Sequence, residues 1–372
     1  MKRFSKLFFA GASALTLMNK AKWLAFAADE KTSTKHYQKE FSDFKLFSTS
    51  DDNELAQEIA FYLKTKIGKL QVLRDQNNDK PIINIMEDVH SKVIYLVCSF
   101  DPERSSMKES IESLISTISA MKGQSPQKVN VILPYFGSSG HAGHVSSDLP
   151  YSQEDLSELL ESAGADKIFT VNLNDDPHHH HQNGTLSSHI PLLEVDAHKL
   201  CASYFQEQRL KDVVIVSTNE ALTDKVNEIK EKLEQGGSKV EIGMIRENTD
   251  NADKLNYIGE SVQNRDVLLV DNIVDSGKPI YNISKFLKNN LGASSIHVFA
   301  PHGVLDHETV DFLDYSPISE LVITNTLPLQ DSYLSPKIHQ ISVAKLLADL
   351  IAQSDFHKNL QELHQQRQTE AL

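Results

Sequence analysis

The chain has 372 residues, of which 40% are hydrophobic and 24% are charged, and its formal net charge is −14. A chain of this length and composition is expected to form two globular, soluble domains, and its hydrophobic content excludes a disordered protein. The excess of acidic residues argues against a nucleic-acid partner, because binding to phosphate backbones needs clustered lysine and arginine side chains.

The N-terminus differs from the rest of the chain, since residues 1–28 carry five basic side chains and no acidic one. An apolar run from Leu7 to Met18 and the sequence Ala25-Phe26-Ala27 resemble a secretory signal with its cleavage site. Two interpretations stay open: a cleaved targeting peptide over 1–27, which would make the protein exported or organellar, and a disordered extension. The apolar run is too short for a permanent membrane span.

Short apolar runs alternate with amphipathic helical stretches from about Phe41 onward. Val93 to Val97 is a continuous run of β-branched and aromatic residues, typical of a strand that is buried on both faces. Ser152 and Asp155 predict a capping pair for a helix that Gly164 ends. The first half is predicted to contain helices over 55–63, 111–121 and 156–160, and strands over 93–97, 129–133 and 168–173.

The second half repeats this alternation, with predicted strands over 213–216, 240–245, 267–270, 296–300 and 321–324 and helices over 226–233 and 283–287. Strand–helix alternation with short connections predicts the α/β fold class, with mostly parallel sheets flanked by helices. Cys98 lies in an apolar run, and Cys201 is the only other cysteine. For Cys98 we favour a buried structural thiol over a disulfide or a nucleophile.

Four successive histidines, His178–His181, interrupt the pattern, and we place the domain junction beside them. Adjacent histidines in a flexible loop can capture transition metals. Because no fixed carboxylate or cysteine partner is apparent for them, we favour a solvated loop over a metal site. The predicted organisation is an N-terminal extension over 1–40, a first domain over 41–184, a second domain over 185–355 and a polar tail over 356–372.

The most informative stretch runs from Val267 to Ile280, where a hydrophobic strand leads into two acidic positions and a small-residue loop that opens a helix. Carboxylates accept hydrogen bonds from ribose hydroxyls, and the amides at a helix N-terminus bind phosphate. This pattern therefore predicts a site for a phosphorylated sugar. Its candidate binding residues are Asp271, Asn272, Asp275, Ser276, Gly277 and Lys278.

This stretch resembles the loop that binds phosphoribosyl pyrophosphate (PRPP) in phosphoribosyltransferases and PRPP synthetases. Other segments resemble the synthetases in particular, in the family's order from about Phe47 to Ile351: Glu87-Asp88-Val89, Pro134-Tyr135-Phe136-Gly137, Ala163 to Lys167, His302 to Leu305 and Thr324 to Pro328. The chain is identified as a divergent member of the ribose-phosphate pyrophosphokinase (PRPP synthetase) family.

The resemblance implies two phosphoribosyltransferase-type domains, with a final helix over 343–352 packed back on the first one. It also implies Mg²⁺ as the cofactor, a homo-oligomer, a cytoplasmic location, and the transfer of a diphosphoryl group from ATP to ribose 5-phosphate. In such a transfer negative charge builds on the phosphates, so cations must be prepositioned. The activity therefore depends on particular positions, several of which are altered in this chain.

The family's nucleotide and metal positions hold unexpected residues. Its adenine-contacting loop aligns with Gln76 to Lys80, which has no aromatic side chain. An Arg-Gln pair aligns with Gly140-His141, and the basic residues beyond it align with Gly143-His144. The metal-binding histidine of an Asp-Leu-His motif aligns with Asn174, which brings neither charge nor an imidazole nitrogen. We therefore assign no metal-binding residue.

The loops that carry out the transfer are altered as well. The catalytic Lys-Arg pair aligns with Met244 and Ile245, so that Arg246 is the nearest surviving basic residue and no catalytic residue is assigned. A Ser-Pro-Asp-x-Gly-Gly turn aligns with Ser217 to Leu222, which lacks both glycines. In the sugar-phosphate loop, Pro279 replaces a threonine and removes a backbone N–H, although proline also suits the first turn of a helix.

Three hypotheses follow. We favour a pseudoenzyme, a binding or regulatory homologue that retains ribose-phosphate binding, because nucleotide, metal and loop-lysine positions are lost together whereas the scaffold motifs persist. Its partners would be ribose 5-phosphate or PRPP, and further copies of itself or an active homologue. The alternative is an active ribose-phosphate diphosphokinase that makes PRPP for nucleotide biosynthesis. If the N-terminus is an export signal, an exported protein with a new role is the third.

Overall fold

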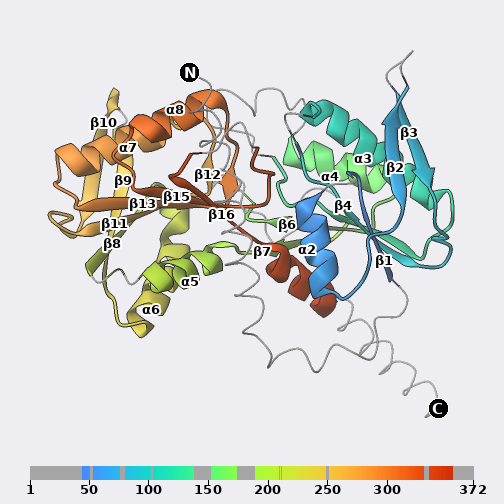
Figure 1. Ribbon diagram of the computed structural model, residues 1–372, viewed down its shortest axis with the longest axis horizontal. Helices are drawn as coiled ribbons and strands as arrows, with labels where there is room; N and C mark the ends of the chain where they lie inside the picture. The colour runs from blue at the N-terminus through green and yellow to red at the C-terminus, as the bar shows by residue number, and fades with distance from the viewer. Residues whose placement is uncertain are drawn as a thin grey trace, which may run out of the picture. The chain divides into compact units, whose positions relative to one another are not determined.

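A computed structural model describes residues 44–50, 53–75, 80–101, 104–137, 152–173, 189–208, 210, 212–248, 251–330 and 335–354 of the chain (Figure 1). Residues 247, 248 and 251–254 are described by their backbone only. Several predicted features lie outside the described residues: the candidate targeting peptide, most of the 76–80 loop, the 140–144 segment, Asn174, His178–His181 and the tail from 356.

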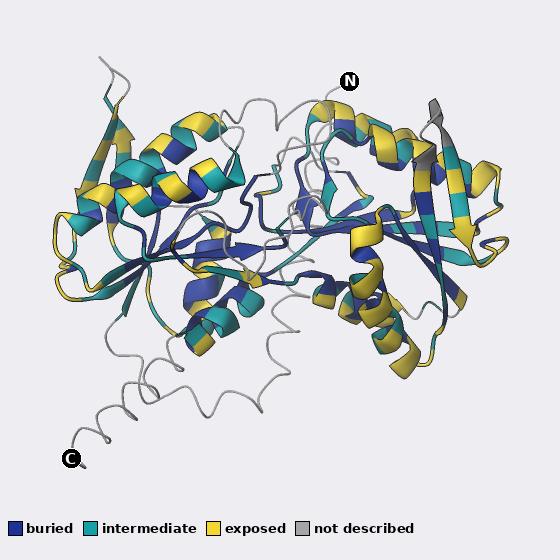
Figure 2. Cartoon of the chain, turned by 180° about the vertical axis from the view of Figure 1, so that it is seen from behind, coloured by how far each residue is buried: buried dark blue, intermediate teal, exposed yellow. Residues whose placement is uncertain are grey.

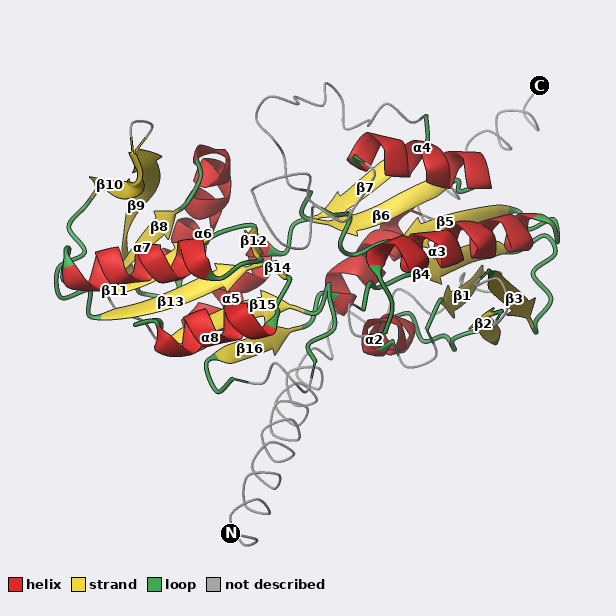
Figure 3. Cartoon of the chain, turned by 90° about the horizontal axis from the view of Figure 1, so that it is seen from above, coloured by secondary structure: helices red, strands yellow, loops and turns green. Residues whose placement is uncertain are grey.

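The first sheet has five strands in the order β1-β4-β5-β6-β7, and β4 to β7 are parallel. Its strands are β1 (Phe44–Ser48), β4 (Val93–Val97), β5 (Lys128–Ile132), β6 (Lys167–Val171) and β7 (Leu192–Val195). Helices α3 (Met107–Lys122) and α4 (Gln153–Ala163) run along one face (Figure 3), and α2 (Glu54–Tyr62) lies over the other. An antiparallel hairpin of β2 (Leu70–Arg74) and β3 (Pro81–Ile85) packs beside α3.

The second sheet has seven strands in the order β10-β9-β8-β11-β13-β15-β16, parallel except for the β9–β10 pair at one edge. Its strands are β8 (Asp212–Ser217), β9 (Lys239–Asn248), β10 (Asn251–Gly259), β11 (Asp266–Val270), β13 (Ser295–Ala300), β15 (Glu320–Thr324) and β16 (Ile338–Ile341). Figure 1 shows α7 (Lys278–Asn289) and α8 (His307–Tyr315) over one face, and α5 (His198–Gln208) and α6 (Thr223–Gln235) over the other.

The central strands of the second sheet are buried on both faces, because alternate residues belong to different cores. Val214 and Val216 of β8 pack in the cluster that includes residues of α7 and α8, whereas Val213 and Ile215 pack in the cluster that includes residues of α5 and α6. Figure 2 shows these strands in dark blue between helices that are exposed on their outer sides. Such strands must be apolar at successive positions, which explains the continuous runs in the sequence.

The predicted α/β class is confirmed, and a strand is present at each apolar run for which one was predicted. The sequence pattern missed β1, the β2–β3 hairpin, β10, the short strands β7 and β16, the two-residue strands over 273–274 and 302–303, and helices α5 and α8. The hairpin escaped detection because Leu73 and Ile82, which stand opposite each other in register, are apolar although both are exposed. Its strands therefore show neither a long apolar run nor a regular alternation of apolar and polar residues.

Both cysteines are buried and free, which confirms the structural role predicted for Cys98. Burial raises the pKa of the Cys98 thiol to about 11 and raises that of Cys201 well above its ordinary value. Neither thiol is therefore ionised at neutral pH, and a cysteine reacts as a nucleophile through its thiolate.

The chain from Lys45 onward forms one compact unit, which includes the contacts between the two halves of the sequence. Strand β7 follows the domain boundary predicted at 184–185 but joins the first sheet. Ser342 and Asn325, from the C-terminal half, both donate hydrogen bonds to the carboxylate of Glu58 in α2. Since Ser342 precedes a helical segment over 344–354, that segment starts against the first half, as the family resemblance implied.

Helix α4 begins and ends at the cap residues that the sequence predicted. Asp155 N donates a hydrogen bond to Ser152 Oγ (3.0 Å), and Ser152 N donates one to Asp155 Oδ2 (3.1 Å), so the predicted capping pair is confirmed. Gly164 ends the helix with a φ of 109°, a conformation disfavoured for residues that have a Cβ. A Cβ at Gly164 would also lie 2.6 Å from Cγ of Lys122, whose ammonium group binds Asp166.

Replacing Gly164 by alanine should lower the free energy of unfolding by about 2 kcal/mol, because left-handed strain is combined with displacement of Lys122. Gly237→Ala is the matched control, since Gly237 also has a positive φ (91°) but a Cβ there would meet nothing within 4 Å. This control should cost about 1 kcal/mol. Urea denaturation followed by circular dichroism measures both losses, and equal losses would contradict the steric contribution.

Candidate functional site

The predicted sugar-phosphate loop lies at the carboxyl edge of the second sheet. It begins at Asp271, directly after β11, and reaches α7 at Lys278. Between them, β12 (Ile273–Val274) pairs in parallel with β14 (His302–Gly303). All six candidate binding residues belong to this single connection. In open α/β sheets, ligands bind at this edge, outside the carboxyl ends of the strands.

The packing of this loop requires glycine at position 277. Gly277 has a φ of 66°, and a Cβ there would lie 3.0 Å from the backbone of Thr309 in α8. The Thr309 hydroxyl donates a hydrogen bond to Asp275 O (2.5 Å), so α8 holds the loop in place. Gly277 is the N-cap residue of α7, so the helix start has no side-chain cap. Pro279 lies in the first turn, as predicted for a proline at the start of a helix. The N–H groups of an uncapped first turn attract anions.

The two carboxylates of the loop are oriented by neighbouring backbone groups. Asn272 N donates to Asp271 Oδ1 (2.8 Å), and Ser276 N donates to Asp275 Oδ1 (2.6 Å). A carboxylate has about four acceptor sites, so each group keeps capacity for further donors such as ribose hydroxyls. Lys278 is exposed at the start of α7 and adds a positive charge to the same connection.

Asp271 lies in an apolar environment at the end of a buried strand. Burial raises the pKa of its carboxyl to about 6, although the N–H of Asn272 favours the ionised form. The residue as a whole keeps some contact with solvent. At neutral pH the group is mostly ionised, and its desolvation costs stability.

A buried polar network connects the end of the first sheet to the second half of the chain. Asp196 follows β7, and its carboxylate lies within hydrogen-bonding distance of three side-chain nitrogens: Asn172 Nδ2 (3.1 Å), His198 Nδ1 (3.0 Å) and Lys225 Nζ (2.7 Å). Although burial opposes ionisation, these bonds hold the pKa of Asp196 well below its usual range. His198 Nε2 lies 3.4 Å from Asp271 O, so the network reaches the sugar-phosphate loop.

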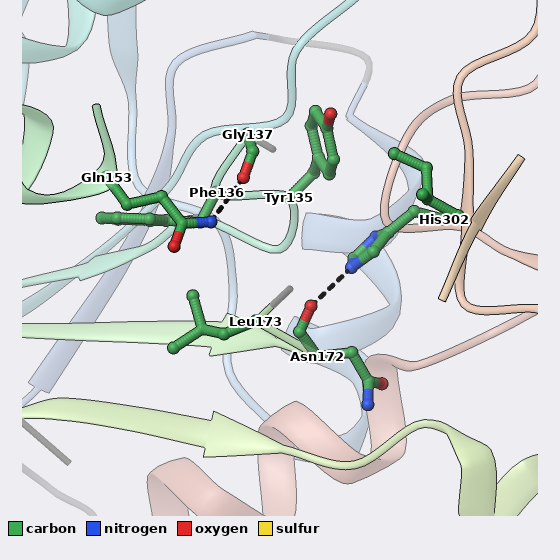
Figure 4. Close-up of a pocket in the computed structure, with 8 residues that line it drawn as sticks. Tyr135, Phe136, Gly137, Gln153, Asn172, Leu173 and His302 are labelled. Carbon is green, nitrogen blue, oxygen red and sulfur yellow. Dashed lines mark hydrogen bonds between the residues drawn. The ribbon is translucent and has the colours of Figure 1, made fainter. Parts of the chain in front are cut away.

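His302 joins the same region from the C-terminal half (Figure 4). Its Nε2 lies 3.0 Å from both Val171 O and Asn172 O, and its Nδ1 lies 2.9 Å from Thr326 Oγ1. Carbonyl oxygens only accept hydrogen bonds, so the proton sits on Nε2 and the Thr326 hydroxyl donates to Nδ1. Burial lowers the pKa of His302 to about 4, and the ring is therefore neutral at physiological pH.

A pocket beside His302 brings the Pro-Tyr-Phe-Gly motif next to the sugar-phosphate connection (Figure 4). The ring centroids of Tyr135 and His302 are 5.1 Å apart. On the far side of the pocket, Gln153 Nε2 donates a hydrogen bond to Gly137 O (2.6 Å). Because Ile273 of β12 also lines the pocket, residues of the two sequence motifs face one space.

The turn from Ser217 to Leu222 is closed by its own groups. Asn219 Oδ1 accepts a hydrogen bond from Ala221 N (3.0 Å), and Asn219 O accepts one from Leu222 N (3.3 Å). Turns that bind phosphate present unbound N–H groups, and glycine lets the backbone approach the anion. The N–H groups of Ala221 and Leu222 are already used, in agreement with the missing glycines.

Arg246 of β9 does not pair with the sugar-phosphate loop in the described part of the chain. It forms an ion pair with Glu220 of the β8–α6 turn instead. Its neighbours Met244 and Ile245 add no charge, and Ile245 is buried. The six candidate binding residues of the 271–278 connection therefore lie together, whereas Arg246 lies against the acidic side chain of Glu220.

Two further properties concern metals and membranes. Among the described residues, no group of three or more His, Cys, Asp or Glu side chains is placed to hold a metal ion. The four-histidine run lies outside those residues, and the preference for a solvated loop over a metal site there stays a prediction. Within the described ranges, no helix combines the length and the hydrophobicity needed to cross a bilayer.

Comparison with known proteins identifies the family. Residues 44–164 match the family model for the N-terminal domain of ribose phosphate pyrophosphokinase, and residues 197–364 match the phosphoribosyl synthetase-associated domain. A ribose-phosphate pyrophosphokinase of Oceanobacillus iheyensis is 30% identical over 313 residues, which cover 83% of this chain and 93% of that protein. The chain belongs to the ribose-phosphate pyrophosphokinase (PRPP synthetase) family.

Other members of this family show similar likeness over most of their length. The ribose-phosphate pyrophosphokinase of Bacillus subtilis is 28% identical over 310 residues, which cover 83% of this chain and 93% of that protein. A crystal structure of phosphoribosylpyrophosphate synthetase from Mycobacterium smegmatis superposes with a TM-score of 0.69 at 23% identity, covering 85% of this chain and 99% of that one. The predicted pair of phosphoribosyltransferase-type domains is thereby confirmed.

Analysis of the sequence did not find Asp196, His198 and Lys225. The three residues stand in no motif quoted for the family, and Lys225 lies 29 positions after Asp196. A hint was available in Asp196, which directly follows β7, and in His198 two positions later, since site residues gather at the carboxyl ends of parallel strands. Because strand β7 itself was not predicted, the sequence did not show that Asp196 lies at the carboxyl end of a strand.

Asp271→Asn should raise the free energy of unfolding at neutral pH by up to about 3 kcal/mol, because an amide avoids the cost of burying a charge. The folded-state pKa is raised, so this cost is absent below about pH 4 and complete above the folded pKa of about 6. Denaturant titrations at about pH 4 and pH 8 measure the difference, with Asp275→Asn in the same loop as the control. Equal stabilisation at both pH values would contradict the assignment.

Protonation of His302 should contribute to acid unfolding. The unfolded ring takes up a proton near its ordinary pKa of 6.5, but the folded ring does so only near 4, so stability is complete above 6.5 and falls as the pH decreases toward 4. The full loss is about 3 kcal/mol. His302→Gln cannot protonate and should show a shallower fall in denaturant titrations, whereas loss of the exposed His90 in His90→Gln should not reproduce this change.

Proposed function

We propose that this protein binds ribose 5-phosphate or PRPP without making PRPP, and that it acts as a binding or regulatory member of its family. It would exert this role in a homo-oligomer or in association with an active homologue. Two observations support the proposal: the sugar-phosphate loop keeps its carboxylates, and the transfer loops lack groups that the chemistry needs.

The side chains of β9 carry the proposal. Transfer of a diphosphoryl group builds negative charge, and prepositioned cations must stabilise it. Where the family resemblance places a Lys-Arg pair, Met244 and Ile245 are apolar. The neighbouring Arg246 lies beside Glu220 of the β8–α6 turn. Neither of the two cations that the family resemblance predicts at positions 244 and 245 is present for a transferring phosphate.

The connection from Asp271 to Lys278 supports binding of the sugar phosphate itself. Asp271 and Asp275 offer acceptors for ribose hydroxyls. The uncapped first turn of α7 and the exposed Lys278 together provide a positive end for a phosphate. Pro279 contributes no N–H to that turn, which reduces the number of donors without abolishing the site.

Mg²⁺ is the cofactor that the family resemblance implies. In phosphate sites Mg²⁺ is usually held by one or two carboxylates together with substrate phosphates, rather than by an all-protein cage. Asp271 and Asp275 fit this limited role through their carboxylate oxygens. Asn172, in the segment that aligns with the family's Asp-Leu-His motif, brings no charge and donates to Asp196. The described residues therefore suit an ion that arrives bound to its phosphate ligand.

The alternative function is that of an active ribose-phosphate diphosphokinase. It is favoured by the relatives, which are described as ribose-phosphate pyrophosphokinases and match over 93% of their length. Such an enzyme would bind ATP and release AMP, and the proposed pseudoenzyme would do neither. Ligand binding and AMP formation therefore separate the two functions.

Calorimetric titration of the full chain should show binding of ribose 5-phosphate or PRPP and no binding of ATP. Lys278→Ala should weaken the sugar-phosphate affinity about tenfold, because it removes a charge-assisted contact. Lys285→Ala removes a positive charge from the same helix farther from the loop, and it should leave the affinity unchanged.

A coupled assay for AMP, with ATP, Mg²⁺ and ribose 5-phosphate, completes the test. The Oceanobacillus iheyensis relative serves as the positive control. We expect no AMP above background from this protein. AMP formation at a rate well above background would establish the alternative, and the absence of sugar-phosphate binding would overturn the proposed ligand.

A further inference from the structure

Nitrogen atoms of the chain itself surround both oxygens of the Asp196 carboxylate. Its Oδ1 accepts a hydrogen bond from His198 N (2.9 Å) and lies 3.0 Å from His198 Nδ1 and 3.1 Å from Asn172 Nδ2. Its Oδ2 accepts a hydrogen bond from the ammonium group of Lys225 (2.7 Å). Because a carboxylate has about four acceptor sites, these contacts already saturate the group.

Other oxygens beside Asp196 are used within the protein as well. Asn172 Oδ1 accepts a hydrogen bond from Ala197 N (2.7 Å), and Glu194 Oε1 accepts one from Leu173 N (3.2 Å). Carboxylate and amide oxygens are the ligands that a hard divalent cation takes from a protein. At the carboxyl end of β7, N–H groups and one ammonium group occupy the oxygens that such an ion would use.

Lys225 supplies the positive charge at this place. Although burial opposes that charge, the hydrogen bond to Asp196 and the nearby carboxylates of Glu194 and Glu228 raise the pKa of Lys225. Its side chain is 35% exposed, whereas Asn172 and His198 are buried. The ammonium group therefore covers Asp196 on the side that ions in solution can reach.

We propose that Lys225 is a built-in cation that takes the place of a divalent metal ion at Asp196. The carboxyl end of β7 then keeps its charge balance without Mg²⁺, and the free protein takes up no metal ion there. The family resemblance implied a metal-binding histidine in the segment that begins at Asn172, and Asn172 contacts the carboxylate that Lys225 neutralises. This inference goes beyond the proposed function and does not depend on the binding of a sugar phosphate.

Replacing Lys225 by alanine should turn this place into a metal site. The variant frees Asp196 Oδ2 and leaves the carboxylates of Asp196, Glu194 and Glu228 without their shared cation. Mn²⁺ serves as the probe, because it takes the same oxygen ligands as Mg²⁺. Titration of the full chain, followed by electron paramagnetic resonance without any phosphate ligand, measures the Mn²⁺ that stays free.

The unmodified protein should show only the weak Mn²⁺ binding of its exposed acidic side chains. Lys225→Ala should gain one site that binds Mn²⁺ at least about tenfold more tightly, because a doubly charged ion is attracted more strongly than an ammonium group. Adding Asp196→Asn to this variant should remove the gained site. Lys225→Met, which keeps an apolar side chain of similar length, should show the same gain and serves if the alanine variant does not fold.

Lys230→Ala is the matched control. It removes an ammonium group from the same helix, where Nζ lies 3.8 Å from the single carboxylate of Glu234, and it should gain no site. An equal gain in this control would show a general charge effect and overturn the inference, as would a folded Lys225 variant that binds Mn²⁺ no more tightly than the unmodified protein. These titrations contain no sugar phosphate, so their outcome is separate from that of the proposed function.

Discussion

The buried carboxylate of Asp196 is the interaction on which the arrangement of the site depends. It gathers Asn172 from the end of β6, His198 from the start of α5 and Lys225 from α6. Removing one partner from a buried charge costs several kcal/mol, so these contacts stabilise the fold as a set. Because His198 also approaches Asp271 O, the position of the sugar-phosphate loop is tied to the same carboxylate.

The Asp196 carboxylate also explains the choice of asparagine at position 172. Its Nδ2 donates to Asp196 and its Oδ1 accepts a hydrogen bond from Ala197 N (2.7 Å). An aspartate in this place would set a second carboxylate against the first. The backbone of Asn172 has a φ of 37°, which asparagine tolerates better than most residues. In the segment that the family resemblance predicted to bind a metal, Asn172 thus supports packing.

The 217–222 turn and the 271–278 connection lie at the same sheet edge, but they differ in how many of their polar groups are already hydrogen-bonded within the protein. The 217–222 turn satisfies its N–H groups internally and pairs its acid with Arg246. The 271–278 connection is held by the Thr309 hydroxyl at Asp275 O, and the first turn of α7, with the exposed Lys278, has no side-chain cap. This contrast is the physical argument for the proposed function, in which the site binds a sugar phosphate and does not transfer a diphosphoryl group.

The sequence by itself determined the α/β class, the buried strands, the caps of α4 and the sugar-phosphate loop, because each depends on residues close together in the chain. The β2–β3 hairpin was not predictable in this way, since the exposed apolar residues Leu73 and Ile82 break the alternation that marks a strand buried on one face. Only the tertiary structure decided that Asp196 meets Lys225, that His302 donates to the carbonyls of Val171 and Asn172, and that Glu220 lies beside Arg246. These contacts join separate segments, and local propensity cannot specify them because their energy comes from burial and charge that exist only in the folded chain.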